Sequence, residues 1–417
     1  MTAVRLHEEH GEVVATWVER GYRGEHVVCL DRHLDLKPLS DKAVSDCVGA
    51  PGSDPSALNR ILPLREAPGA FGLDDFWSAG PISGRVDRLT WIVPGQVSGL
   101  LGRRRLMSAV SYIRAAPDVV DRTVFDADRL RTELCGLTVD IRSLDGLLAA
   151  PPADDFRIDV DLDWFAVPGQ PNEFDPRLLA EELTSRGWLD RLDSLTYSVR
   201  SGFLDESQRW IADDLLHAVG RTGQRNDRST LSATPVRSLA ALRRGAHLAP
   251  AIMQDIVDSE LYALDAVGSA LEGLLNLYCS TDTASGTTGA ATAVSVAERC
   301  WDRAAALGVQ STWLAYGLGQ HWYRQGCHER ARLWLDRARG KLDDPLEGHA
   351  QVLAALCSAR VGDLADAADR AAELAAVFPL NVRVCSLAVV SARRIGRAVD
   401  PGIVRRLTTI TNWMIGR

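Results

Sequence analysis

Up to about residue 206, short apolar runs alternate with stretches of helical spacing. The apolar runs predict strands at 26–31, 88–94, 137–141, 156–165 and 195–200. Residues 176–188, between the last two runs, predict a helix. Strands separated by helices imply crossover connections, which produce a mainly parallel sheet with helices on both faces. The pattern therefore predicts an α/β domain over about residues 1–220.

The apolar pattern changes after about Asp213, where β-branched runs disappear and Ala, Leu and Arg dominate. Residues 221–238 are rich in polar residues and Gly, which predicts a linker, and residues 280–293 predict a second flexible loop. The remaining stretch, residues 239–417, is predicted to be an all-α domain.

Within this helical stretch, two segments 36 residues apart repeat small and large residues in the order typical of tetratricopeptide (TPR) repeats. The matching positions are Leu318, Gly319, Trp322, Gly326, Ala331, Leu335 and Ala338, then Gly362, Ala367, Ala371 and Pro379. We interpret the domain as a TPR-like solenoid that binds a peptide or protein partner. A generic helical bundle is the alternative.

The composition and net charge of the chain disfavour some classes of function. The chain has 417 residues, 46% of them hydrophobic and 24% charged, which is typical of two or three ordinary globular domains. The net charge of −8 disfavours nucleic acid as a partner. No run approaches the ~18 apolar residues of a membrane span, and no apolar segment follows Met1, so we expect a cytoplasmic protein without a membrane partner. The eight cysteines form no CxxC pair, which favours reduced thiols.

Three segments carry candidate chemistry: "LHEEHGEVVATW" (6–17), "DRHLD" (31–35) and "DVDLD" (159–163). The last two directly follow apolar strand residues, so we expect them at the carboxyl ends of strands, where open α/β sheets bind ligands. Carboxylates held close together repel each other unless a cation neutralises them. Oxygen and imidazole donors without sulfur favour Mn²⁺ or another octahedral metal over a structural zinc. The sequence therefore predicts a metal site, and Asp-x-His-x-Asp can place its first carboxylate between two metals.

The order His, Asp-x-His-x-Asp, Asp-x-Asp resembles the ureohydrolase family of arginases and agmatinases. More closely, "EEHGEVVATW", "VVCLDRHLDL", "DDFWSAGPISGRVDRLTWIVP" and "IDVDLDWF" resemble, in order, segments of a divergent arginase-like family whose bacterial members include peptide arginases. The resemblance covers roughly residues 4–205. It implies an arginase/deacetylase-like sheet with two Mn²⁺ ions, and hydrolysis of a peptide arginine to ornithine and urea by a bridging hydroxide.

The resemblance also implies roles for single residues. One manganese would be held by His10, Asp31, Asp35 and Asp159, and the other by Asp31, His33, Asp159 and Asp161. Asp161 would also accept the proton in catalysis, and Glu206, 45 residues after Asp161, would bind the substrate guanidinium. Two alternatives stay open: Asp161 and Asp163 as the second ligand pair, and His7 in place of His10.

Other polar and aromatic residues near these segments have simpler interpretations. Glu8, Glu9 and Glu12 are expected on a solvated face, although one of them could pair with a guanidinium. Trp77 and Trp91 are expected to be core aromatics, and Asp75 has no assigned role.

The chain departs from ordinary arginases in two places. "LKPLS" follows Asp35 where arginases have the loop that grips a free amino acid, and no histidine lies between His33 and His217 to act as the proton shuttle. A peptide substrate is therefore favoured over free arginine. The competing hypotheses are a deacetylase-like amidohydrolase with one zinc at an Asp, His, Asp site, and a non-catalytic TPR-type scaffold.

Overall fold

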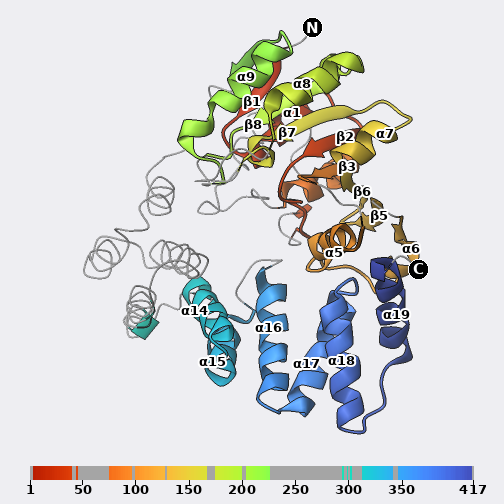
Figure 1. Ribbon diagram of the computed structural model, residues 1–417, viewed down its shortest axis with the longest axis vertical. Helices are drawn as coiled ribbons and strands as arrows, with labels where there is room; N and C mark the ends of the chain where they lie inside the picture. Colours follow the sequence, from red (N-terminus) through yellow and green to blue (C-terminus); the bar gives the residue numbers. More distant parts are fainter. Residues whose placement is uncertain are drawn as a thin grey trace. The chain divides into compact units, whose positions relative to one another are not determined.

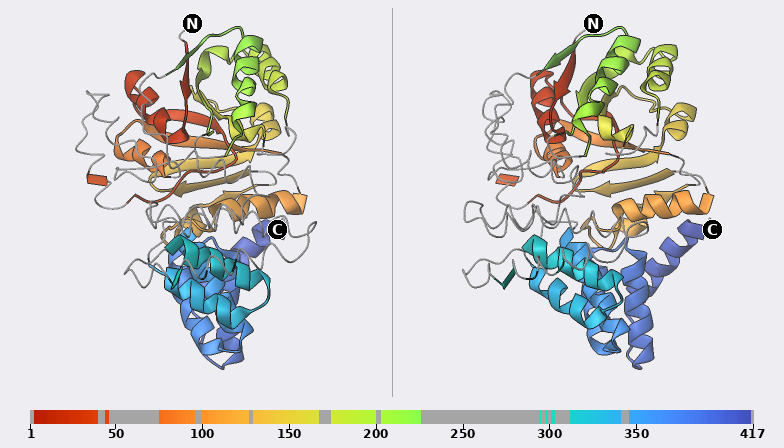
Figure 2. Two further views of the ribbon diagram at one scale, coloured as in Figure 1. Left: turned by 90° about the vertical axis from the view of Figure 1, so that its left-hand side faces the viewer. Right: turned by 60° about the vertical axis from the view of Figure 1, so that its left-hand side comes forward.

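A computed structural model of the chain divides into two compact units, residues 1–232 with 410–417 and residues 233–409 (Figures 1 and 2). The structure describes residues 3–39, 44–45, 75–95, 99–126, 129–166, 174–199, 203–225, 294, 298, 301–302, 312–340 and 346–415. The predicted loop at 280–293 and residues 226–238 of the predicted linker lie outside these ranges.

The first unit is built on a nine-stranded sheet of order β4-β5-β6-β3-β2-β7-β8-β1-β9 (Figure 1). Its strands are β1 Val4–His7, β2 Glu25–Leu30, β3 Val86–Val93, β4 Val124–Phe125, β5 Arg129–Leu134, β6 Leu137–Ser143, β7 Arg157–Asp161, β8 Leu192–Thr196 and β9 Gly223–Arg225. All pairings are parallel except β4 with β5 and β5 with β6. The predicted α/β class with a mainly parallel sheet is therefore confirmed.

Three predicted strands, at 26–31, 88–94 and 137–141, match β2, β3 and β6 closely. The predicted strand at 156–165 is too long, because β7 ends at Asp161 and a 3-10 turn, η3 (Leu162–Trp164), follows. The strand predicted at 195–200 begins earlier and ends at Thr196. Strand β9 lies within the residues predicted as a linker, so the sheet extends beyond the predicted boundary at residue 220.

Helices cover both faces of the sheet, as predicted. Apolar side chains of β2 and β7, including Leu30 and Val160, form one core with residues of α7 (Leu144–Ala149), α8 (Pro176–Ser185) and α9 (Trp210–Ala218). Leu6 of β1 joins this core, whereas its neighbour His7 reaches Thr16 of α1 (Val13–Glu19). Because successive strand residues face opposite sides, Cys29 and Asp159 point towards the face that carries α1.

Shorter elements complete the first unit. They are η1 His10–Glu12, η2 Phe76–Ser78, α4 Ala79–Ile82, α5 Gly99–Val110, α6 Val119–Arg122, η4 Leu189–Arg191 and η5 Glu206–Gln208. Helix α8 begins where the sequence predicts, because Asp175 accepts a hydrogen bond from the backbone N–H of Arg177 and Pro176 occupies the first turn.

The second unit is helical in its described part, as predicted. Its helices are α14 Thr312–Arg324, α15 His328–Ala338, α16 Leu346–Arg360, α17 Leu364–Val377, α18 Val382–Arg394 and most of α19 Pro401–Ile415. From α14 to α18 each helix packs against the next, and α16 also contacts both α14 and α18. Gly326, Gly362 and Gly396 follow α14, α16 and α18 with φ of 74°, 87° and 69°, a conformation that favours glycine. The third of these glycines continues the repeat noticed at the first two.

Close helix packing explains one predicted small residue. A Cβ placed on Gly319 of α14 would lie 2.6 Å from Cγ of Leu335 in α15, which is buried. Ala331 and Ala338 of α15 and Ala367 and Ala371 of α17, all predicted packing positions, are also buried.

Two further expectations concern membranes and thiols. Within the described ranges, no helix is long and apolar enough to cross a membrane. Cys29, Cys327, Cys357 and Cys385 are free thiols, and Cys47, Cys279 and Cys300 lie outside the described residues.

We predict that Gly319→Ala destabilises the helical unit. Overpacking against Leu335 costs about 1–3 kcal/mol, and the better helix propensity of alanine offsets about 1 kcal/mol of this. Urea unfolding followed by far-UV circular dichroism measures the change. Leu333→Ala, at a side chain 53% exposed on α15, is the control and should stay within about 0.5 kcal/mol of wild type. A Gly319→Ala protein more stable than wild type would contradict the packing described.

Candidate metal centre

The three segments singled out in the sequence converge at one edge of the sheet. Strands β2 and β7 are parallel neighbours with Cys29 opposite Asp159, so the residues that follow them emerge side by side. The indole N–H of Trp91 donates to the carbonyl of Asp31 at 2.9 Å and fixes the chain where β2 ends. His10 arrives from η1, which follows β1. The topology therefore brings together side chains far apart in the sequence, such as those of His10 and Asp159, which are 149 residues apart.

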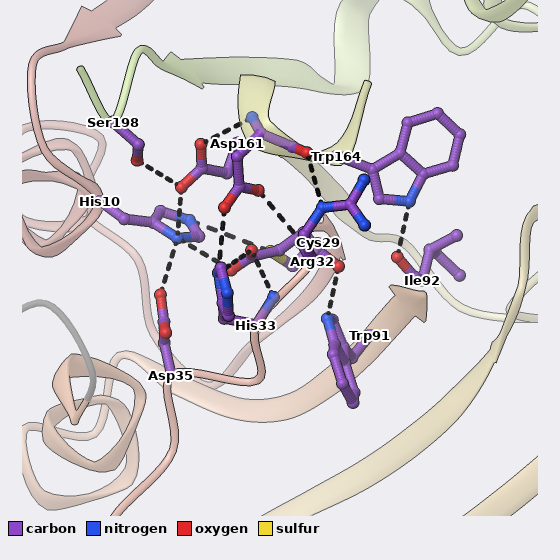
Figure 3. Close-up of polar contacts among 12 residues, drawn as sticks. His10, Cys29, Arg32, His33, Asp35, Trp91, Ile92, Asp161, Trp164 and Ser198 are labelled. Carbon is purple, nitrogen blue, oxygen red and sulfur yellow. Dashed lines mark hydrogen bonds and ion pairs between the residues drawn. The ribbon is translucent and has the colours of Figure 1, made fainter. Parts of the chain in front are cut away.

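His10 is the centre of the first group (Figure 3). Its Nδ1 lies 3.0 Å from Oδ2 of Asp31, 3.1 Å from Oδ2 of Asp35 and 3.3 Å from Oδ2 of Asp161. On the other side of the ring, Nε2 lies 2.7 Å from Oδ2 of Asp159. Only 2% of the His10 side chain is exposed, so these contacts are shielded from water.

His33 is the centre of the second group. Its Nδ1 lies 3.0 Å from Oδ2 of Asp163 and 3.9 Å from Oδ1 of Asp31, and its backbone N–H donates to the same Asp31 oxygen at 2.8 Å. The His33 side chain is 41% exposed and packs beside the ring of Phe203. Asp31 thus presents one oxygen to each histidine and links the two groups.

The structure places Asp161 and Asp163, rather than Asp159, in the two groups that include Asp31. Donor atoms of His10, Asp31 and Asp161 lie within 4.8 Å of one another, and so do those of Asp31, His33 and Asp163. Among the residues that the structure describes, Asp159 shares such a group only with His10 and Cys29. The strand ending explains the difference, because η3 turns Asp163 towards His33 directly after β7 ends.

Two serines that the sequence analysis missed support the carboxylates. The hydroxyl of Ser194 donates to Oδ1 of Asp159 at 2.5 Å. The hydroxyl of Ser198 donates to Oδ2 of Asp161 at 2.6 Å (Figure 3). Ser194 lies in β8 and Ser198 comes just after it, and β8 pairs with β7. The signal in the sequence was position alone, since Ser198 lies in the strand predicted at 195–200 and Ser194 directly precedes it.

The backbone at this edge is strained. Asp35 and Ser198 both have φ of 48°, a left-handed conformation that non-glycine residues seldom adopt. Such conformations cost on the order of 1–3 kcal/mol each and concentrate at functional sites. The side chain of Asp35 contacts His10, and that of Ser198 contacts Asp161. Both strained residues therefore belong to the cluster.

Comparison with known proteins adds no assignment. No protein-family model and no curated protein matches the chain.

Several other singled-out residues lie outside the cluster. His7 shares a hydrogen bond with Thr16 at 2.8 Å, and burial lowers its pKa to about 4. Of the two alternatives His7 and His10, it is His10 that contacts the carboxylates. Glu206 is 63% exposed on η5 and pairs with Nε of Arg209 at 2.8 Å, and Glu8 pairs with the same guanidinium. The structure therefore does not bring Glu206 into the cluster.

The expectation of a solvated face at Glu9 and Glu12 is wrong, because both are buried in the turn that carries His10. Glu12 accepts a hydrogen bond from the backbone N–H of Glu8, which holds that turn closed. Trp77 and Trp91 are buried core aromatics as expected, and Asp75 immediately precedes η2.

The buried carboxylates of the cluster repel one another, and a bound cation would offset this repulsion. Burial, together with the neighbouring Asp35 and Asp163, raises the pKa of Asp31 to about 8. Burial and Asp163 also raise the pKa of Asp161. For His33, burial lowers the pKa, but Asp163 and Asp31 outweigh it and raise the pKa to about 10. Without a metal the cluster therefore retains protons at neutral pH, and a divalent cation would take their place.

Two buried oxygens fit the same interpretation. Oδ2 of Asp31 and Oδ2 of Asp163 accept no well-formed hydrogen bond from the residues that the structure describes, and each faces Nδ1 of a histidine at 3.0 Å. Buried carboxylate oxygens normally have hydrogen-bond partners. Imidazole and carboxylate donors in this arrangement suit a divalent metal.

We predict that Mn²⁺ stabilises the wild-type chain and not the Asp31→Asn variant. At a free metal concentration 100 times Kd, binding adds about 2.7 kcal/mol to the free energy of unfolding. Asp31 touches both groups, so its loss should remove most of this gain. Urea unfolding at pH 7, with Mn²⁺ or with a chelator, measures it.

The free energy of unfolding of Asp31→Asn without metal is a second test of the metal centre. Because Asp31 has a pKa of about 8 and is mostly protonated at pH 7, an isosteric asparagine should change the metal-free stability by less than about 1 kcal/mol. Asp121→Asn, at an exposed position on α6, is the matched control and should keep the full metal effect. Equal unfolding of wild type with metal and with chelator would contradict the metal centre.

Proposed function

We propose that the chain is a manganese-dependent hydrolase that acts on the guanidino group of an arginine within a peptide or protein and releases urea, leaving ornithine. The observation that carries the proposal is the position of Asp31 between a buried His10 group and a partly exposed His33 group, at the carboxyl ends of adjacent parallel strands. Shared carboxylates between two groups of ligands are a feature of two-metal hydrolytic sites.

The ligand roles follow the two groups. His10, Asp31, Asp35 and Asp161 would hold one cation, and Asp31, His33 and Asp163 the other. A bound pair of cations supplies a hydroxide nucleophile at neutral pH by lowering the pKa of water, and polarises the substrate. Mn²⁺ is proposed because the donors are hard oxygens and imidazole.

The reaction adds water to the guanidinium carbon and breaks the bond from that carbon to the side-chain nitrogen. Both protons of the water leave its oxygen as urea forms, and both end on the departing nitrogen, which leaves as the ornithine ammonium group. We assign the proton acceptor to Asp161, whose position is fixed by Ser198 and by the backbone N–H of Asp163 at 3.2 Å. The acidic cluster also favours a cationic group at this edge, as a guanidinium is.

The residues after Asp35 support a peptide substrate. Leu36 and Lys37 are buried, and the hydroxyl of Ser78 donates to the carbonyl of Lys37, so this segment packs inwards. Residues 36–39, the part of this segment that the structure describes, offer no exposed polar side chain of the kind that gripping a free amino acid requires. The guanidinium-binding role of Glu206 stays a prediction, since its partner in the structure is Arg209.

The helical unit is proposed to be a TPR-type repeat that recruits the peptide or a protein partner. The close contact of Gly319 with Leu335 and the recurring glycines at 326, 362 and 396 support a helical-hairpin repeat. Grooves of such repeats bind extended or helical segments.

One observation favours a second candidate. Asp31, His33 and Asp163 form a group on their own, and His33 is the more exposed of the two histidines. An Asp, His, Asp group open to solvent would suit a deacetylase-like amidohydrolase with one zinc. The number of metals bound per chain separates the two candidates, since only the first requires the His10 group.

We predict Mn²⁺-dependent urea release from a mixture of arginine-containing peptides, with free arginine a poorer substrate. Asp31→Asn should lower the rate more than about a hundredfold, because loss of a shared ligand exceeds the 10–100-fold effect of removing a supporting residue. A coupled urea assay with the metal-loaded full chain measures this. Asp121→Asn should retain full activity.

Two results of this assay would count against the proposal. Urea release that persists in a chelator would exclude the metal mechanism. Loss of acetyl groups from acetyl-lysine peptides with one zinc per chain, and no urea, would support the second candidate instead.

A further inference from the structure

We propose that Asp159 is a positioning residue that orients His10 towards the cluster and is not itself a metal ligand. The inference rests on the proposed metal centre. The sequence resemblance placed Asp159 among the ligands, so the proposal changes its role.

The two nitrogens of His10 face different partners. Nδ1 lies 3.0–3.3 Å from oxygens of Asp31, Asp35 and Asp161, whereas Nε2 lies 2.7 Å from Oδ2 of Asp159. When Nε2–H donates to Asp159, the lone pair of Nδ1 is directed at the three carboxylates. A metal-binding histidine commonly donates its other ring N–H to a carboxylate, which fixes both tautomer and ring orientation.

Asp159 is itself held by the sheet. Its Cα pairs with Cys29 of β2 on one side and with Ser194 of β8 on the other. Oδ1 accepts from the Ser194 hydroxyl at 2.5 Å, and Oδ2 accepts from His10 and, at 3.7 Å, from the Cys29 thiol. These side chains are all buried, which makes the arrangement rigid.

The same contacts leave Asp159 without a place in the two groups that share Asp31. Its donor atoms join His10 and Cys29 but not Asp31, His33 or Asp163. Asp161, two residues later on the same face of β7, reaches the Nδ1 side of His10 instead. Two hydrogen bonds, from Ser194 to Asp159 and from His10 to Asp159, therefore connect the interior of the sheet to the metal cluster.

We test this role with Asp159→Asn, which keeps the side-chain volume, and with Ser194→Ala, which leaves Asp159 in place but removes one of its hydrogen bonds. Isothermal titration calorimetry of the full chain with Mn²⁺ measures the affinity for Mn²⁺ and the number of ions bound. The visible absorption of the Co²⁺-loaded proteins reports on the geometry of the metal ligands. Circular dichroism confirms folding of each variant.

Asp159→Asn should weaken Mn²⁺ binding about 10–100-fold with two ions still bound at saturation, because an amide can also donate to Nε2 and favour the wrong tautomer. Ser194→Ala should weaken binding several-fold in the same direction. Both should shift the Co²⁺ spectrum. Asp121→Asn, at an exposed position on α6, is the control and should bind Mn²⁺ as wild type does.

Two results would overturn the inference while leaving the proposed function intact. A loss of one of the two ions in Asp159→Asn would make Asp159 a ligand. Affinity and spectrum identical to wild type in both variants would make its hydrogen bond to His10 purely structural. A wild-type chain that takes up no metal would overturn the proposed function and this inference together.

Discussion

The cluster depends on how the buried Asp31 carboxylate is neutralised, by a proton or by a metal ion. This carboxylate has no exposed surface and has Asp35 and Asp163 as like-charged neighbours, so its ionised form is costly in the fold. Two histidines face it, one to each oxygen, and they offset part of that cost. The positive φ of Asp35 and of Ser198 adds strain at the same edge. A protein retains such unfavourable features mainly where its chemistry requires them.

The sheet makes this concentration of charge possible. In a parallel sheet, neighbouring strands end at the same edge, and β2 and β7 deliver their acidic residues there together. Strand β8 adds Ser194 and Ser198, and β1 leads into the turn with His10. The hydrophobic residues on the other face of β2 and β7 pack against α7, α8 and α9, and this packing keeps the strand ends in register.

Much of this arrangement follows from the sequence, but some of it requires the folded chain. The apolar runs of β2, β3 and β6 are long enough to predict, and the convergence of His10, Asp31 and Asp161 follows from their places relative to strands. Asp159, Asp161 and Asp163 recur at every second position, so the sequence alone does not fix which pair joins the cluster. That choice depends on where β7 gives way to η3, a boundary that local preferences leave open. Ser194 and Ser198 belong to no motif, and β9 has too few apolar residues to signal an edge strand.

The most direct test of the account is anomalous diffraction from crystals of the full chain grown with Mn²⁺. We predict two manganese peaks, one on either side of the Asp31 carboxylate. One should lie beside Nδ1 of His10 with Asp35 and Asp161, and the other beside Nδ1 of His33 with Asp163. A structure with manganese elsewhere, or with no manganese between these side chains, would contradict it.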